Sequence, residues 1–205
     1  MKMRSSVGWD VLKMKATFMF RLKAFLYDDI LIMLYAVALF VVSTFLIPSL
    51  QNLFQGSVVV AQLTGFFVIT LPVSLYFVIC DSRLVGQTFG KKKVGIRVVN
   101  QEGESLSVFH SSMRTILKFT PWEMSHFLVY RLVHIGSEGV PLHLNIIGGV
   151  IYALIFTYIL TAIFTRRKQA LYDLICRTQV IVVKEIHENE QGNENTKTNP
   201  STSSF

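Results

Sequence analysis

The chain has 205 residues, of which 51% are hydrophobic and 12% aromatic, with a mean hydropathy of +0.46 and a formal net charge of +7. A water-soluble domain of this size cannot bury so much apolar surface, so the composition excludes that class and indicates a membrane protein. Nucleic-acid binding is not expected, because the basic residues lie beside apolar segments, where they attract anionic lipid.

Residues 1–19 mix lysine and arginine with single apolar residues. This pattern is not typical of a cleaved signal peptide, in which a basic start leads directly into a short apolar region. We expect an amphipathic N-terminal segment in the cytoplasm, with Trp9 to Phe20 lying along the inner membrane surface. A frayed basic tail is the alternative.

Three uncharged segments approach or exceed the roughly 20 residues that cross a ~30 Å hydrocarbon layer. They are Ile30 to Ile47, Val58 to Cys80 and Leu144 to Phe164. Basic residues precede the first segment and follow the second, while the loop between them carries no charge. The positive-inside rule therefore places the N terminus in the cytoplasm. Arg166, Arg167 and Lys168 place the C terminus there too, which requires an even number of crossings.

We expect the fourth crossing between Val108 and Ile135, a segment of poor hydropathy. An ionised residue at the centre of a span costs about 2.5 to 3.5 kcal/mol, so Glu123 must be protonated, paired or hydrated. Pro121 should kink this helix and free a backbone carbonyl, which protein or water must then satisfy. The alternative is an interfacial helix and only three crossings.

The predicted fold class is an all-α polytopic membrane protein, a four-helix transmembrane bundle with both termini in the cytoplasm and spans at about 28–48, 58–80, 112–135 and 144–165. A small cytoplasmic β-element should accompany it, with a hairpin at about 93–108 and Thr178 to Val183 as a further strand. Extended linkers are the alternative. Residues 184–205 are rich in Asn, Glu, Thr and Ser and predict a disordered cytoplasmic tail.

Three separated blocks of residues resemble the RDD family of membrane proteins, which is named for one Arg and two Asp. They are Arg21-Leu-Lys-Ala-Phe-Leu-Tyr-Asp28, Gly86-Gln-Thr-Phe-Gly90-Lys91 with Val94-Gly-Ile-Arg-Val-Val99, and Arg166-Arg-Lys-Gln-Ala-Leu-Tyr-Asp173. The resemblance covers most of residues 20–183, which it implies form one transmembrane domain. It implies that Arg21, Asp28 and Asp173 occupy the naming positions. Tyr172 is a departure, because many members carry His before this Asp.

The resemblance implies a membrane protein but leaves its activity open. Our first hypothesis is structural, with Arg21 paired to Asp173 and Asp28 accepting hydrogen bonds from Arg114, Lys118 or the glycine-containing cytoplasmic loop. Gly86 and Gly90 are interpreted as turn residues of that loop, which ends at Lys91. The protein would then be a non-enzymatic scaffold or regulatory subunit of the cell membrane.

The second hypothesis is a small transporter for a proton or monovalent cation, as has been suggested for some family members. Its path would use Asp28, Asp29, Glu123 and His126, since a desolvated carboxylate is a suitable proton site. A third hypothesis is an interaction protein that binds another membrane protein or a second copy through its cytoplasmic segments. Membrane lipid is the remaining expected partner. We expect no enzymatic activity, metal or cofactor, because no such residue pattern stands out.

Overall fold

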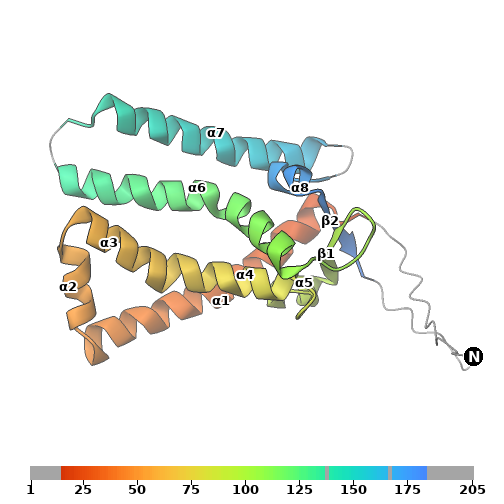
Figure 1. Ribbon diagram of the computed structural model, residues 1–205, viewed down its shortest axis with the longest axis horizontal. Helices are drawn as coiled ribbons and strands as arrows, with labels where there is room; N and C mark the ends of the chain where they lie inside the picture. The colour runs from red at the N-terminus through yellow and green to blue at the C-terminus, as the bar shows by residue number, and fades with distance from the viewer. Residues whose placement is uncertain (1–14, 137–138, 166–167, 184–205) are drawn as a thin grey trace, which may run out of the picture.

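The computed structural model describes residues 15–136, 139–165 and 168–183. The predicted tail 184–205, residues 1–14 of the N-terminal segment, and Arg166 and Arg167 lie outside the described residues. Long helices run side by side, and a small sheet with two short helices lies at one end of them (Figure 1). We call this end, which contains α5 (Phe89–Val94), α8 (Leu171–Ile175), β1 (Ile96–Asn100) and β2 (Thr178–Val182), the sheet end.

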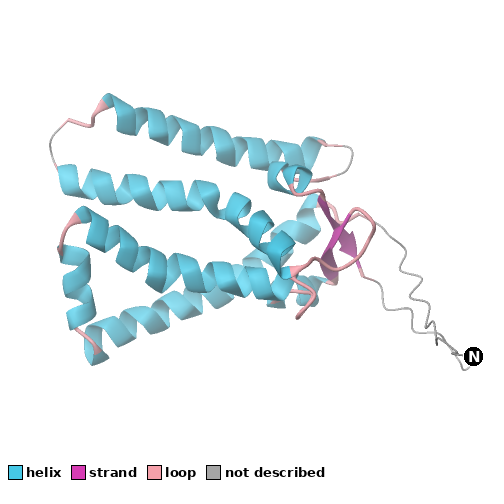
Figure 2. Cartoon of the chain, viewed as in Figure 1, coloured by secondary structure: helices cyan, strands magenta, loops and turns pink. Residues whose placement is uncertain are grey.

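The molecule is mostly helical, as predicted (Figure 2). Its elements are α1 (Phe18–Val41), the π-helical turn η1 (Val42–Leu46), α2 (Ser49–Gln55), α3 (Val58–Gly65), the π-helical turn η2 (Phe66–Thr70), α4 (Leu71–Asp81), α5 (Phe89–Val94), β1 (Ile96–Asn100), α6 (Val108–Ile135), α7 (Leu142–Phe164), α8 (Leu171–Ile175) and β2 (Thr178–Val182). Three stretches among the described residues are long and apolar enough to cross a membrane, namely Phe18–Leu46, Val58–Asp81 and Leu142–Phe164.

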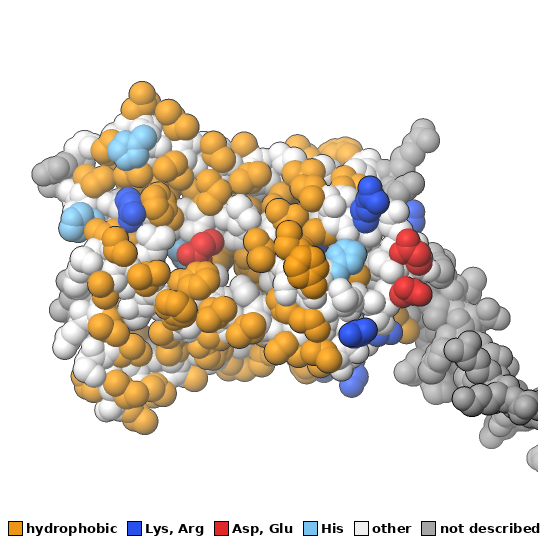
Figure 3. All heavy atoms as spheres, viewed as in Figure 1, with side chains coloured by type: hydrophobic (Ala, Val, Ile, Leu, Met, Phe, Trp, Pro, Cys, Tyr) orange, Lys and Arg blue, Asp and Glu red, His pale blue; other side chains and the backbone are white. Residues whose placement is uncertain are grey.

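The fourth predicted crossing corresponds to α6, which carries Arg114, Lys118, Glu123 and Arg131 and is not one of these three stretches. The chain leaves the sheet end along α1, returns along α3, η2 and α4, leaves again along α6 and returns along α7 (Figure 1). Helix α6 packs against both α4 and α7. Hydrophobic side chains cover much of the face seen in Figure 3, while the charged ones gather mostly at the sheet end.

Local sequence chemistry explains where several of these helices begin and end. The hydroxyls of Ser57 and Ser107 cap α3 and α6 by accepting hydrogen bonds from backbone amides three residues ahead, at 3.3 and 3.2 Å. Gly95 ends α5 in the left-handed conformation, with φ of +72°. This glycine turns the chain directly into β1.

Pro121 lies inside α6 and cannot donate a hydrogen bond to the carbonyl of Leu117, four residues before it. The Tyr158 hydroxyl of α7 donates to that carbonyl instead, at 2.7 Å. The helix changes direction part of the way along its length (Figure 1). The acceptor freed by the proline is therefore satisfied by a neighbouring helix, and this hydrogen bond ties α6 to α7.

The predicted strand at Thr178 to Val183 is present, but the predicted hairpin at 93–108 is wrong. Strand β1 pairs antiparallel with β2, from Ile96 opposite Val182 to Asn100 opposite Thr178, and the sheet has these two strands. Ser105 and Leu106 form only isolated bridges, to Val99 and Ser82 respectively. The turn after β1 brings Ser105 back beside Val99, but the next residues cap and begin α6, so no second hairpin strand forms.

Of the predicted amphipathic segment, the structure describes only the residues from Lys15 onward. Residues 15–17 are not helical, and α1 begins only at Phe18. The Ala16 amide donates to the Val180 carbonyl at 2.9 Å, and Lys15 forms a bridge with Ile181. This pairing buries Ala16 in the apolar core that joins the sheet to α1, a cluster of Ala16, Ala24, Ile96, Val98, Leu106 and Val180.

Candidate functional site

A chain of alternating charges crosses the bundle at the sheet end. Arg21 of α1 donates to Asp173 of α8 at 2.7 Å, and Arg114 of α6 donates to the other oxygen of Asp173 at 2.9 Å. Arg114 also reaches Asp81, at the end of α4, at 3.0 Å. Lys91 of α5 completes the series with a bond of 2.6 Å to Asp81. These five residues, which we call the ion network, join five separate helices.

The ion network is buried, so its charged groups depend on one another for stabilisation in place of water. Asp173 and Asp81 are 0% and 1% exposed, so each carboxylate needs its cations. Burial alone would raise the pKa of Asp173, but the guanidinium groups of Arg114 and Arg21 outweigh that effect and hold this pKa below its usual value. Burial lowers the pKa of Lys91, and attraction to Asp81 offsets this only in part. Removing one residue of a pair would leave the charge of its partner buried and uncompensated.

Asp28 is held by a different set of donors. Its two oxygens accept hydrogen bonds from the Thr88 hydroxyl at 2.6 Å, the Gly90 amide at 2.7 Å and the Tyr76 hydroxyl at 2.9 Å. The glycine-containing loop, one of the donors proposed for Asp28, thus supplies two of these bonds, and Tyr76 of α4 supplies the third. Arg114, another proposed donor, binds Asp173 and Asp81 instead. The Thr88 side chain also caps α5, so Asp28 fixes the start of that helix against α1.

Gly90 is not the turn residue that its sequence suggests, because it lies inside α5. A Cβ atom at this position would overlap the carbonyl oxygen of Ala24 and approach the Asp28 carboxyl carbon to 2.9 Å. Glycine is therefore needed here for close approach of α5 to α1. Gly86 does adopt a turn conformation, with φ of +92°.

Tyr172 lies beside the ion network, with its ring 5.2 Å from the Arg114 guanidinium carbon. Burial, followed by the neighbouring Asp173 charge, raises the pKa of Tyr172 to about 12. The phenol therefore stays protonated at physiological pH. Its ring supplies an aromatic packing surface for Arg114 and Tyr158.

Glu123 and His126 form a second polar site, farther along α6 than Arg114. The Thr70 hydroxyl donates to Glu123 at 2.9 Å, and His126 Nδ1 lies 3.7 Å from the same carboxylate oxygen. Glu123 lines a cavity of about 700 Å³ formed mainly by α3, η2, α4 and α6. Asp28 and Asp29 do not line this cavity. The structure thus pairs Glu123 with His126 but does not join them to the two aspartates.

The sequence analysis did not identify Asp81 as a site residue. It proposed Arg114 only as a donor to Asp28, whereas Arg114 donates to both Asp173 and Asp81. A signal for Asp81 was present, because it follows an uncharged run directly, and a carboxylate at that position needs a buried partner. Asp29, beside Asp28, is partly exposed and has no hydrogen bond or ion pair within the described part of the chain. It takes no part in either site.

Three helices able to cross a membrane, closed at one end by buried ion pairs and a two-stranded sheet, define a helical membrane protein. The chain belongs to the RDD family, whose model matches residues 15–177. That range contains Arg21, Asp28 and Asp173, all three of the naming positions inferred from the sequence. Comparison with curated proteins and with solved structures found no match.

Proposed function

We propose that this protein is a non-enzymatic scaffold or regulatory subunit of the cell membrane, built as a four-crossing bundle with both termini in the cytoplasm. The ion network carries this proposal, because it joins α1, α4, α5, α6 and α8 at one end. Removing one member of a buried ion pair typically costs about 3 to 5 kcal/mol. Such a network favours a fixed arrangement of helix ends.

Two observations support four crossings. Helix α6 lies against α4 and α7, two helices that belong to candidate membrane spans. The bridge between Lys15 and Ile181 also brings the beginning and the end of the described chain together at the sheet end. Lys91, Lys92 and Lys93 lie at that end as well, which the positive-inside rule assigns to the cytoplasm.

Labelling of single cysteines tests this topology, in a background where Cys80 and Cys176 are replaced by serine. Four crossings predict that a membrane-impermeant maleimide labels Asn52→Cys and Val140→Cys in intact cells, but labels Gln101→Cys only after permeabilisation. If Val140→Cys is also protected in intact cells, α6 does not cross and the four-crossing bundle is wrong.

The scaffold would present its cytoplasmic surface to another membrane protein or to a second copy of the chain. Exposed Lys92 lies on α5, which the ion network and Asp28 hold, and exposed Gln101 and Glu102 directly follow β1. Within the network each carboxylate oxygen is already engaged by a cation or a hydrogen-bond donor. Those carboxylates are therefore used in holding helices together.

A small cation or proton-coupled transporter is the second candidate, and the Glu123 site favours it. Glu123, His126 and Thr70 come together beside the cavity of about 700 Å³. An ionisable residue inside a membrane bundle often marks an ion or proton path. Asp28 is not part of this candidate path, because its oxygens are occupied at α5.

Flux measurements on the purified full chain in liposomes distinguish the two candidates. The scaffold predicts no movement of H⁺, Na⁺ or K⁺ above that in protein-free liposomes under any imposed gradient. Flux that is lost in Glu123→Gln but kept in the exposed control Glu104→Gln would overturn the scaffold and support the transporter.

A further inference from the structure

A cavity of about 290 Å³ lies at the sheet end between α1, α6 and α7, and four cationic side chains line it. Arg21, Lys91, Arg114 and Lys118 all contribute to its wall. Asp28 is the carboxylate in that wall, and its oxygens already accept three hydrogen bonds. We call this space the basic cavity.

The cations of the basic cavity are not all satisfied by the carboxylates around them. The ammonium group of Lys118 lies 3.6 Å from the centre of the Phe77 ring, and no carboxylate in the described part of the chain is within ion-pair distance of it. Arg21 uses one nitrogen for Asp173, while its Nε and Nη2 are buried and lack a hydrogen-bond partner. Buried donors without an acceptor are rare and costly. The two free donors of Arg21 are therefore suited to an anionic acceptor, and Lys118 adds a positive charge in the same cavity wall.

The apolar part of the wall indicates how such an anion would be presented. Leu22 and Phe25 of α1 line the cavity and are 37% and 48% exposed, and Ile159 of α7 lines it from the other side and is 41% exposed. All three belong to stretches able to cross a membrane, so their exposed surfaces are suited to hydrocarbon. The basic cavity thus combines cationic donors with an apolar entrance.

We propose that the basic cavity binds a phosphate-bearing anion, with Lys118 and the free donors of Arg21 as its ligands, and that the anion is the headgroup of an acidic phospholipid. Phosphate oxygens accept several charge-assisted hydrogen bonds at once, which suits one guanidinium and one ammonium group. A lipid tail would fill the apolar entrance, which a free phosphate ion leaves empty. This inference goes beyond the scaffold and does not depend on it.

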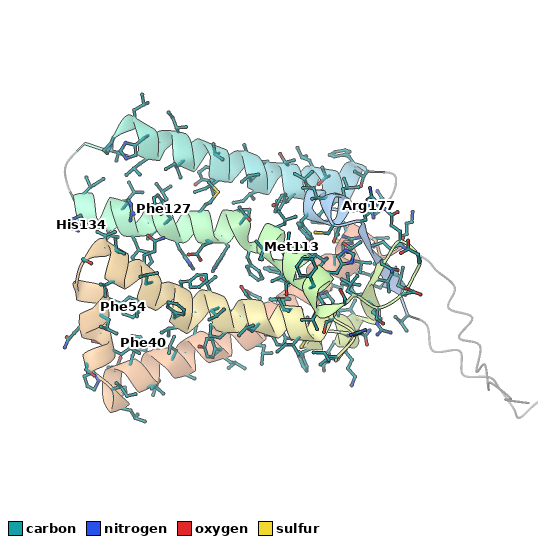
Figure 4. All side chains as sticks on the ribbon, in the orientation of Figure 1. Phe40, Phe54, Met113, Phe127, His134 and Arg177 are labelled. Carbon is teal, nitrogen blue, oxygen red and sulfur yellow. The ribbon has the colours of Figure 1, made fainter. Side chains whose placement is uncertain are left out.

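Thermal unfolding of the purified full chain in detergent tests the proposal. The probes are phosphatidylglycerol, phosphatidylcholine and inorganic phosphate, each added to the wild type, to Lys118→Gln and to Arg131→Gln. Arg131 is a matched control, because it lies on the same helix and its guanidinium carbon is 4.1 Å from the centre of the Phe127 ring. Phe127 lies farther from the sheet end than Met113 does (Figure 4), and Arg131 does not line the basic cavity.

We expect phosphatidylglycerol to raise the unfolding midpoint of the wild type and of Arg131→Gln more than phosphatidylcholine does. Lys118→Gln should bind phosphatidylglycerol about fivefold more weakly, as expected for the loss of one basic contact near a membrane surface. Lys118→Arg keeps the charge and should retain the effect, which also serves if Lys118→Gln does not fold. Native mass spectrometry of retained lipid gives an independent readout of affinity.

The alternative outcomes each decide the question. If inorganic phosphate reproduces the shift with the same dependence on Lys118, the site is supported and its anion is a free phosphate. If the phosphatidylglycerol shift is equal in all variants, or if no probe stabilises the wild type above phosphatidylcholine, the proposal is wrong.

Discussion

Tyr158→Phe removes one hydroxyl and isolates the bond that compensates for Pro121. The Leu117 carbonyl accepts from Tyr158 at 2.7 Å, and Pro121 has no amide hydrogen to replace that donor. The aromatic ring remains, including its edge-to-face contact with Tyr172 at 5.2 Å between ring centres. The substitution therefore changes hydrogen bonding much more than packing.

The expected loss follows from the cost of an unsatisfied carbonyl. A buried polar group without a partner costs about 1 to 3 kcal/mol, while hydrogen bonds between helices in membranes average about 0.6 kcal/mol and reach about 1.7 kcal/mol. Tyr158 is partly buried, so we expect Tyr158→Phe to lower the free energy of unfolding by about 1 kcal/mol. Unfolding in mild detergent with a chemical denaturant measures this difference.

Two further variants make the result specific. Tyr152→Phe is the matched control, because Tyr152 lies on the same helix and is 66% exposed, and its substitution should be nearly neutral. Pro121→Ala restores an amide that can donate to Leu117, so Tyr158→Phe should cost less in that background. The reasoning is refuted if Tyr158→Phe costs the same in both backgrounds, or if it is as neutral as the control.

Two other predictions concern the sheet end. Gly90→Ala should destabilise the protein by at least about 1 to 3 kcal/mol, because the added Cβ overlaps the Ala24 backbone. The control Gly149→Ala places its Cβ in open space inside α7 and should stabilise the protein by up to about 1 kcal/mol. Equal midpoints of the two variants in thermal unfolding would contradict the close approach of α5 to α1. Because the pKa of Asp173 is depressed in the folded state, its contribution is present above the unfolded value of about 3.9 and is lost as the pH falls through the folded value. Asp173→Asn should therefore flatten the acid limb of a stability profile measured between about pH 3 and 7, and an unchanged limb would assign the acid sensitivity to other groups.

Much of the helical architecture could be predicted because it depends on local sequence. Uncharged runs marked three stretches able to cross a membrane, and the structure has them. The resemblance to the RDD family singled out Arg21 and Asp173, the cost of unpaired charge near a membrane suggested that they pair, and the two groups meet at 2.7 Å. The same reasoning required a donor for the carbonyl freed by Pro121, although it could not identify Tyr158.

The rest depended on contacts between distant residues. The β-branched runs at Val98 and at Thr178 to Val183 indicated strands, and these two strands pair with each other, but the nearby segment at Ser105 does not form the predicted hairpin strand. Arg114 was proposed only as a hydrogen-bond donor to Asp28, although a guanidinium group can donate to two carboxylates at once. Sequence spacing on one helix cannot show which acidic groups neighbouring helices will bring to it.

A double-mutant cycle on Arg21 and Asp173 tests most directly whether the ion network holds the helix ends together. Asp173 accepts from both Arg21 and Arg114, so Asp173→Ala should lower the free energy of unfolding by about 3 to 5 kcal/mol and Arg21→Ala by less. The double variant should be little less stable than Asp173→Ala alone. Losses that add to within about 0.5 kcal/mol would show that the two residues do not stabilise each other and would contradict the account.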